Sequence, residues 1–208
     1  MKNQIKIKVC GMKYPQNILE VEKLLPDFIG FIFYEKSKRL VDEETFFVET
    51  QNIKRIGVFV NETIEVILDK INQNQLDGVQ LHGDELPQFC ELIKPKSLVI
   101  KAFQVDENFD FNQLEAYRKY VDYFLFDTKS SDENRGGTGK KFNWNVLENY
   151  KLSVPFFLSG GITNEDIEAI KNFYHPQLYG VDINSGFEES PAVKNIEKIS
   201  TFIRDLRK

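Results

Sequence analysis

The hydrophobic pattern of this chain alternates between short apolar runs, rich in β-branched and aromatic residues, and longer amphipathic runs. Eight short runs predict β-strands over residues 5–10, 28–33, 55–60, 78–82, 98–103, 123–126, 155–158 and 178–183. The amphipathic runs predict helices over residues 15–25, 43–50, 63–72, 86–93, 111–120, 143–149, 164–173 and 196–207. Strands that are apolar on both faces are typical of a parallel sheet covered by helices.

Eight strand–helix units in 208 residues leave roughly 25 residues per unit, near the lower size limit of a closed barrel. We therefore predict an α/β protein, a single-domain (β/α)8 TIM barrel that spans residues 1–208. A doubly wound open sheet is the competing architecture. The count of eight favours the barrel, as do the polar residues and glycines that cluster where the strands end, because those ends form one face of a barrel.

Composition and charge narrow the possible partners. The formal net charge is −5, and no face is obviously basic, which argues against a nucleic-acid partner. No apolar run approaches the roughly 20 residues that span a bilayer, and the amino-terminal stretch is too polar for a signal peptide. The two cysteines, Cys10 and Cys90, lack metal-ligand spacing. We expect a reduced cytoplasmic protein with no membrane partner and no metal site.

The stretch from Tyr123 to Trp144 combines a predicted strand with a glycine-rich loop. Its apolar run ends in Asp127, and the segment Gly136-Gly137-Thr138-Gly139 follows, with Lys140 behind it. A carboxylate just past a buried strand, next to a basic glycine loop, suggests a catalytic acid beside an anion site. A strand-capping aspartate followed by a disordered loop explains the same residues equally well.

Two further residues, Cys10 and Lys101, have both a chemical and a structural explanation, and a third candidate is a histidine. Cys10 by itself is typical of a buried core residue, whereas in a cationic pocket it would serve as a base or nucleophile. Lys101, inside an apolar strand, is either a Schiff-base nucleophile or a barrel-interior cation paired with a strand-end carboxylate such as Asp127; we favour the ion pair. His82 lies at a strand-to-helix turn.

Two glycine-containing turns follow the seventh and eighth predicted strands. Gly160 and Gly161 precede Thr163, where the next helix begins, and Asn184, Ser185 and Gly186 follow the last strand. Backbone N–H groups at a helix amino terminus attract anions. Phosphate sites after strands 7 and 8 recur in this architecture, so the two turns together predict a phosphate site.

An ordered set of motifs resembles the phosphoribosylanthranilate isomerase family of tryptophan biosynthesis. The resemblance covers essentially the whole chain and is carried by VCGM (9–12), GFIF (30–33), SKRLV (37–41), VFVN (58–61), QLHG (80–83), FDT (126–128), GGTGK (136–140) with Trp144, SGG (159–161) and VDINSG (181–186). It implies a cofactor-independent Amadori rearrangement. The phosphosugar substrate, N-(5-phosphoribosyl)anthranilate, would become 1-(2-carboxyphenylamino)-1-deoxyribulose 5-phosphate, as in other aldose–ketose isomerisations.

The resemblance also implies roles for particular residues. Asp127 would be the general acid that opens the ribose ring, and Cys10 the base that removes the C2 proton. Arg39 would bind the anthranilate carboxylate, a role suited to its guanidinium fork. The remaining substrate-binding residues would be His82, Gly137, Gly160, Gly161, Asp182, Asn184, Ser185 and Gly186. Strands 6, 7, 8 and 1 are consecutive around a barrel, so the phosphate loops would lie between acid and base.

Acid and base make opposite demands on pKa. Burial must raise the pKa of Asp127, and positive neighbours must lower that of Cys10.

The chain departs from the usual family pattern at Lys38, where proline is common, and at Asn184, where serine is common; neither change removes a proposed catalytic group. A Schiff-base aldolase using Lys101 and a phosphate-binding barrel without catalysis remain alternatives, and either a monomer or a homodimer is compatible with the sequence.

Overall fold

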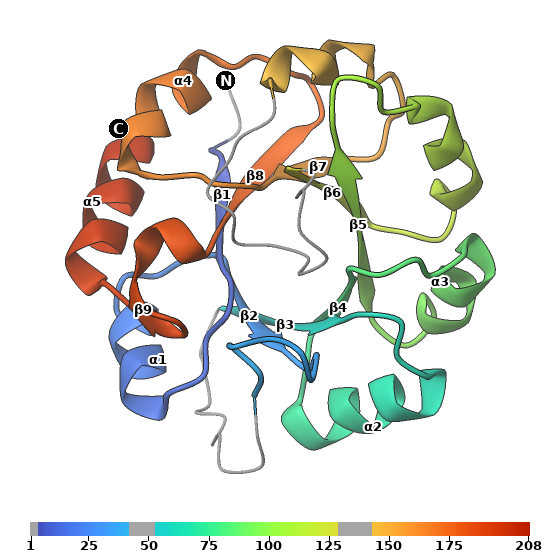
Figure 1. Cartoon of the computed structure of the whole chain (residues 1–208), viewed down its shortest axis with the longest axis horizontal. Coiled ribbons are helices and arrows are strands. Elements are labelled where there is room, and N and C mark those ends of the chain that lie inside the picture. The colour runs from blue at the N-terminus through green and yellow to red at the C-terminus, as the bar shows by residue number, and fades with distance from the viewer. Residues whose placement is uncertain (1–3, 42–52, 129–142) are drawn as a thin grey trace.

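The computed structural model describes residues 4–41, 53–128 and 143–208, and in it the eight predicted strands form a closed parallel barrel (Figure 1). Neighbouring strands pair in chain order, and β8 pairs with β1, for example Val181 with Ile7. This last pairing closes the sheet and excludes the open doubly wound alternative, so the predicted (β/α)8 fold is confirmed. The strands are β1 (Lys6–Val9), β2 (Phe28–Ile32), β3 (Lys54–Phe59), β4 (Gly78–Leu81), β5 (Leu98–Val105), β6 (Tyr123–Thr128), β7 (Phe156–Leu158) and β8 (Leu178–Ile183).

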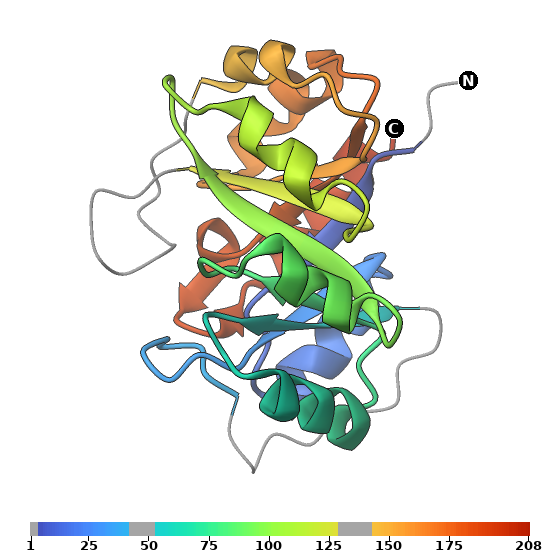
Figure 2. The ribbon, with the colours of Figure 1, turned by 90° about the vertical axis from the view of Figure 1, so that its right-hand side faces the viewer.

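Helices cover the outside of the barrel (Figures 1 and 2). The α-helices are α1 (Pro15–Glu22), α2 (Ile64–Asn74), α3 (Pro87–Ile93), α4 (Ile167–Asn172) and α5 (Ile196–Leu206). Local signals explain their starts: prolines open α1 and α3, and the side chains of Thr63 and Asn195 cap α2 and α5. The helix predicted over residues 43–50 lies outside the described residues. Among the helices that the structure describes, none is both long and apolar enough to cross a membrane.

Two segments predicted as α-helices are 3-10 helices instead, namely η1 (Phe111–Tyr117) and η2 (Trp144–Asn149). In η1 the core-facing residues Phe111, Leu114 and Tyr117 are three apart, and in η2 so are Trp144 and Leu147. A strict three-residue repeat places side chains on one face of a 3-10 helix, whereas an α-helix also needs apolar residues four apart. A shorter 3-10 turn, η3 (Asn164–Asp166), precedes α4.

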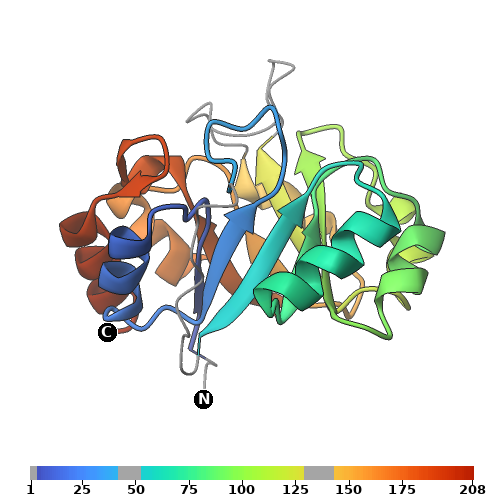
Figure 3. The same ribbon diagram turned by 90° about the horizontal axis from the view of Figure 1, so that it is seen from below.

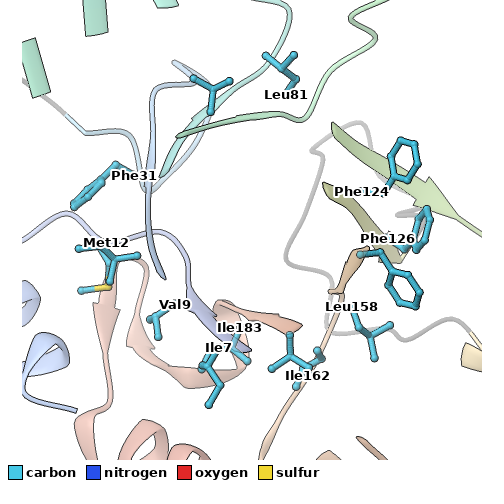
Figure 4. Packing of buried hydrophobic residues seen from close by; sticks show 14 of the residues in the cluster. Ile7, Val9, Met12, Phe31, Leu81, Phe124, Phe126, Leu158, Ile162 and Ile183 are labelled. Atoms are coloured by element: carbon cyan, nitrogen blue, oxygen red, sulfur yellow. The ribbon is translucent and has the colours of Figure 1, made fainter. Parts of the chain in front are cut away.

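The core has two layers, separated by the strands. The larger layer lies between strands and helices and includes Phe124, Phe126, Leu158 and Ile183 (Figure 4). The smaller fills the barrel interior with Phe28, Ile56, Ile100, Ala102, Leu125 and Phe157. Phe28 and Phe157 pack edge to face at 5.3 Å. Because Phe28 begins β2 while polar side chains lie further along the strands, aromatic residues fill the amino-terminal end and leave the carboxyl end for chemistry.

The carboxyl ends of the strands meet at one rim, above which the segment after β2 rises (Figure 3). After β8 the chain forms η4 (Ser185–Phe187) and then a two-stranded hairpin of β9 (Glu188–Ser190) and β10 (Val193–Lys194). The hairpin was not predicted, since its strands have three and two residues and too few positions for a visible alternation. It brings Glu188 and Lys194 to the rim.

Candidate active site

A cavity of about 450 Å³ opens at the carboxyl rim of the barrel. Of the eleven residues that the sequence analysis proposed for the site, ten line this cavity; the eleventh, Gly137, lies outside the described residues, as does the rest of the glycine loop 136–140. The ten are Cys10, Arg39, His82, Asp127, Gly160, Gly161, Asp182, Asn184, Ser185 and Gly186. Residues more than 170 positions apart in the chain therefore share one pocket, because a closed parallel barrel gathers its strand ends.

At the end of β1, Cys10 lies beside a buried ion pair. The Nζ atom of Lys8 donates to Oδ1 of Asp182 at 2.8 Å, and the Oγ atom of Ser159 donates to Oδ2 of the same carboxylate at 3.4 Å. Burial raises the pKa of the Cys10 thiol, although the nearby Lys8 ammonium opposes this shift. The expected positive neighbour is present, but the expectation of a lowered pKa is wrong for this structure because desolvation outweighs the attraction.

Asp127 ends β6 on the other side of the cavity and lies against His82. The Nε2 atom of His82 is 3.5 Å from Oδ2 of Asp127, and its Nδ1 atom is 2.8 Å from the side-chain nitrogen of Gln80. With Nδ1 accepting from the Gln80 amide, the ring proton would be on Nε2 and would point toward the carboxylate. The Thr128 backbone N–H donates to Oδ1 of Asp127 at 2.8 Å. Each carboxylate oxygen of Asp127 therefore has a neighbouring group that helps to fix the orientation of the side chain.

The two glycine turns lie between acid and base, since β7 and β8 separate β6 from β1. Gly160 has φ +96° and Gly161 φ +64°, conformations that favour glycine. A Cβ on Gly160 would come within 2.6 Å of the Thr128 backbone nitrogen, so this turn packs directly on the strand that carries Asp127. Backbone N–H groups at such turns suit an anion.

Arg39 is held by a buried carboxylate on the hairpin. Its Nε and Nη2 atoms donate to the two oxygens of Glu188 at 2.8 Å and 2.6 Å. Lys194 donates to the same carboxylate at 2.7 Å and to Oδ1 of Asn184 at 2.7 Å. Gly11, with φ +76°, leaves room here, because a Cβ on it would lie 2.7 Å from both Arg39 Cδ and Asn184 Oδ1. The proposed carboxylate-binding arginine and the loop after β8 thus form one network.

Lys101 does not have the position that we favoured from the sequence. Its strand neighbours Ile100 and Ala102 fill the barrel interior, so Lys101 faces the helix layer and cannot pair with Asp127. Its Nζ atom donates to Glu85 at 3.0 Å and to the Gly83 carbonyl at 2.8 Å. Lys101 is a buried ion-pair partner, as expected, but the partner named in the prediction is wrong. This orientation also argues against the Schiff-base aldolase.

Sequence reasoning missed Lys8, Gln80, Glu188 and Lys194. Alternation along the strands was the available signal for the first two, since Lys8 is two residues before Cys10 and Gln80 two residues before His82. No comparable signal exists for the hairpin pair. Within the described part of the chain, no group of three or more His, Cys, Asp and Glu side chains is arranged to hold a metal ion.

Comparisons with known proteins agree with this site. Residues 7–205 match the family model described as N-(5'phosphoribosyl)anthranilate (PRA) isomerase. The N-(5'-phosphoribosyl)anthranilate isomerase of Parabacteroides distasonis is 47% identical, over 96% of this chain and 92% of the relative. The crystal structure of phosphoribosyl anthranilate isomerase from Thermus thermophilus superposes with a TM-score of 0.84 at 26% identity, covering 97% of this chain and 98% of that one.

A second solved structure carries a ligand. It is a phosphoribosyl anthranilate isomerase in complex with reduced 1-(o-carboxyphenylamino)-1-deoxyribulose 5-phosphate. It superposes with a TM-score of 0.80 at 32% identity and covers 97% of this chain and 98% of that one.

Proposed function

Because the chain belongs to the N-(5'-phosphoribosyl)anthranilate isomerase family, we propose that Asp127 and Cys10 are the general acid and general base of its reaction. The activity itself is the isomerisation of N-(5'-phosphoribosyl)anthranilate in tryptophan biosynthesis. The single observation that supports the assignment of the pair is that both side chains line one cavity from strands on either side of the two glycine turns.

Asp127 would act first. Opening the ribose ring needs a proton on the ring oxygen, and the electron pair of the aniline nitrogen then forms a protonated Schiff base. The His82 ring and the Thr128 N–H hold the two carboxyl oxygens, so the carboxyl group keeps one orientation. A fixed orientation favours proton transfer to a single atom of the substrate.

Cys10 would act second, by removing the C2 proton. The electrons of the C2–H bond then form the C1–C2 double bond of an enolamine, and the electrons of the C1–N double bond return to the nitrogen and neutralise it. Tautomerisation then gives the ketone. Burial keeps the thiol pKa high, but a protonated Schiff base next to the sulfur is itself a cation. A nearby cation favours the thiolate, so the base would form at the step that needs it.

The substrate carries two anionic groups, and the cavity has a site for each. Gly160, Gly161 and the segment 184–186 would bind the phosphate, and Arg39 would bind the anthranilate carboxylate. Support comes from the related structure whose ligand bears both a carboxyl and a phosphate group. Both sets of residues line the same cavity, as binding of one ligand with both anionic groups requires.

We further propose that residues 1–208 act as one catalytic domain, in the cytoplasm and without a cofactor, on this small-molecule substrate. The two cysteines that the structure leaves unbridged agree with a reducing compartment. Assembly as a monomer or homodimer stays a prediction; one related structure is of monomers generated from a dimeric enzyme.

Turnover assays of Asp127→Asn and Cys10→Ser test the roles of acid and base. We expect kcat to fall by roughly 10²–10⁴-fold in each, followed as the loss of phosphoribosylanthranilate fluorescence. Binding of the reduced product analogue should persist, because neither residue is proposed to hold the phosphate or carboxylate. Cys90→Ser, a change in the second buried thiol, serves as the control and should keep its activity. Near-full activity of Asp127→Asn would exclude the acid assignment.

A further inference from the structure

Lys8 is a fully buried lysine inside the barrel that the two-residue mechanism does not use. It lies two residues before Cys10 on β1, so both side chains point to the same face of the strand, into the interior. Its exposed side-chain fraction is 0%, and its carboxylate partner Asp182 is exposed by 6%. A buried ammonium next to a proposed catalytic thiol calls for an explanation.

The space around these two side chains is set by Gly30 on the neighbouring strand β2. A Cβ built on Gly30 would lie 2.8 Å from the Cys10 sulfur and 3.1 Å from Lys8 Nζ. The sulfur and the ammonium therefore both lie against the space that a side chain at position 30 would occupy. Lys8 is close enough for its charge to act on the Cys10 thiol and lower its pKa against the effect of burial.

Lys8 has the charge and the donors for a second partner. Burial alone would lower its pKa, but Asp182 and Cys10 together raise that pKa above the ordinary value, so the ammonium keeps its proton. An ammonium has three donors, and Asp182 accepts one of them at 2.8 Å. Lys8 is able to hold its carboxylate and donate to the sulfur at the same time.

The other charged groups near Cys10 are already committed or farther along the rim. Lys194 on β10 and Arg39 after β2 both bind Glu188, Asp182 on β8 binds Lys8, and Asp127 on β6 faces His82 from β4. Among these groups Lys8 is the cation with the largest effect on the thiol.

We propose that Lys8 is the positioning residue of the base: it donates a hydrogen bond to the Cys10 thiolate and so stabilises the form that accepts the C2 proton. This inference rests on the proposed role of Cys10. Lys8 itself transfers no proton; the C2 proton moves to sulfur, and the ammonium remains bound to Asp182 throughout. A purely structural role, in which the Lys8–Asp182 pair only fills the interior, would leave the thiol pKa unchanged.

The experiment measures the thiolate directly, apart from turnover. The full-length protein is alkylated with iodoacetamide between pH 6 and 10, and carbamidomethylation of the Cys10 peptide is followed by mass spectrometry. We expect Lys8→Met to raise the apparent pKa of Cys10 by at least about one unit, which slows alkylation at pH 7.5 by about tenfold or more. The ascending limb of kcat/KM against pH should move in the same direction.

Lys101→Met is the matched control. Lys101 is equally buried and equally paired, with Glu85 at 3.0 Å, but it faces the helix layer. It should destabilise the fold without moving the alkylation profile of Cys10. If Lys8→Met does not fold because Asp182 is left unpaired, the double variant Lys8→Met/Asp182→Asn removes both charges. Its Cys10 pKa should still rise, but by less, because the Asp182 charge that raises this pKa is also removed.

An unchanged Cys10 profile in the folded Lys8 variant, single or double, overturns the proposal. A shift of the same size in Lys101→Met overturns it too, since the effect would then be a general loss of stability. Failure of the proposed function has a different signature: Cys10→Ser would keep its turnover while Lys8→Met still shifted the alkylation profile.

Discussion

Glu188→Gln would leave two cations, Arg39 and Lys194, at the rim without the carboxylate that now joins them. The side chains of Glu188 and Lys194 are exposed by only 6% and 0%, and that of Arg39 by 17%. Burial would raise the pKa of Glu188, but Arg39 and Lys194 outweigh burial and hold it below its ordinary value. Burial already holds the pKa of Lys194 low with Glu188 beside it, so without the carboxylate we expect the ammonium to lose its proton.

Removing one member of a buried ion pair costs about 3–5 kcal/mol. The lower end applies here, because glutamine keeps an acceptor for the Ala192 N–H, which donates to Oε1 of Glu188 at 3.1 Å. The partly exposed Arg39 is also able to turn toward water. With a urea dependence of roughly 2–3 kcal/mol per molar for a chain of this size, a loss of about 3 kcal/mol lowers the unfolding midpoint by about 1 M or more.

The same change should weaken substrate binding more than chemistry. Arg39 would lose the two hydrogen bonds that orient its guanidinium, so we expect KM to rise by about tenfold, equivalent to about 1.4 kcal/mol, with a smaller change in kcat. Urea unfolding and steady-state kinetics measure the two effects on one preparation.

Glu189→Gln provides the control for this variant. Glu189 is the next residue of the hairpin, is exposed, and accepts a hydrogen bond from the Asn195 side chain at 3.1 Å. Its substitution should leave the urea midpoint and KM at their wild-type values. Adding Lys194→Met to Glu188→Gln should recover part of the stability, because the buried amine that has lost its carboxylate partner is replaced by an apolar side chain. Wild-type stability and KM in Glu188→Gln would refute the view that this carboxylate holds the network together.

Two further predictions concern a turn and a buried thiol. In Gly160→Ala, the positive φ of +96° and the close approach of the new Cβ to Thr128 should cost roughly 1–3 kcal/mol and raise KM; thermal unfolding and kinetics test this, and a wild-type melting temperature would contradict it. Burial raises the pKa of the Cys90 thiol to about 11. This folded-state pKa lies above that of the unfolded chain, so between about pH 8.5 and 11 the thiol ionises in the unfolded chain but not in the folded one. The free energy of unfolding therefore keeps its full Cys90 contribution below about pH 8.5 and loses up to about 3 kcal/mol as pH rises toward 11. Urea midpoints measured from pH 8 to 11 should therefore fall less steeply in Cys90→Ala than in the wild type, and parallel curves would show that the thiol is not responsible.

The sequence alone supported the barrel and much of the cavity lining. Eight apolar runs alternating with amphipathic ones specify parallel strands joined by helical crossovers, and such strands must all end on the same side. Residues just past each run, such as Cys10, Asp127 and Gly160, therefore had to meet at one rim if the sheet closed. Local chemistry also predicted the start of α1 at Pro15 to the residue, and that of α3 to within one residue, at Leu86 rather than Pro87.

Only the tertiary structure decided which way each strand residue points and which charges pair. Lys8 and Lys101 both lie within strands buried on both faces, and the hydrophobic pattern alone does not say which face of such a strand points to the interior. Apart from the two-residue spacing between Lys8 and Cys10, it therefore does not show that Lys8 faces the interior while Lys101 faces the helices. The pairs that matter join residues far apart in the chain: Lys8 with Asp182 across 174 positions, and Arg39 with Glu188 across 149. Such pairs arise from the register of strands around the closed barrel and from the hairpin after β8. A short-range pattern along the chain carries no information about that register or about where the hairpin folds.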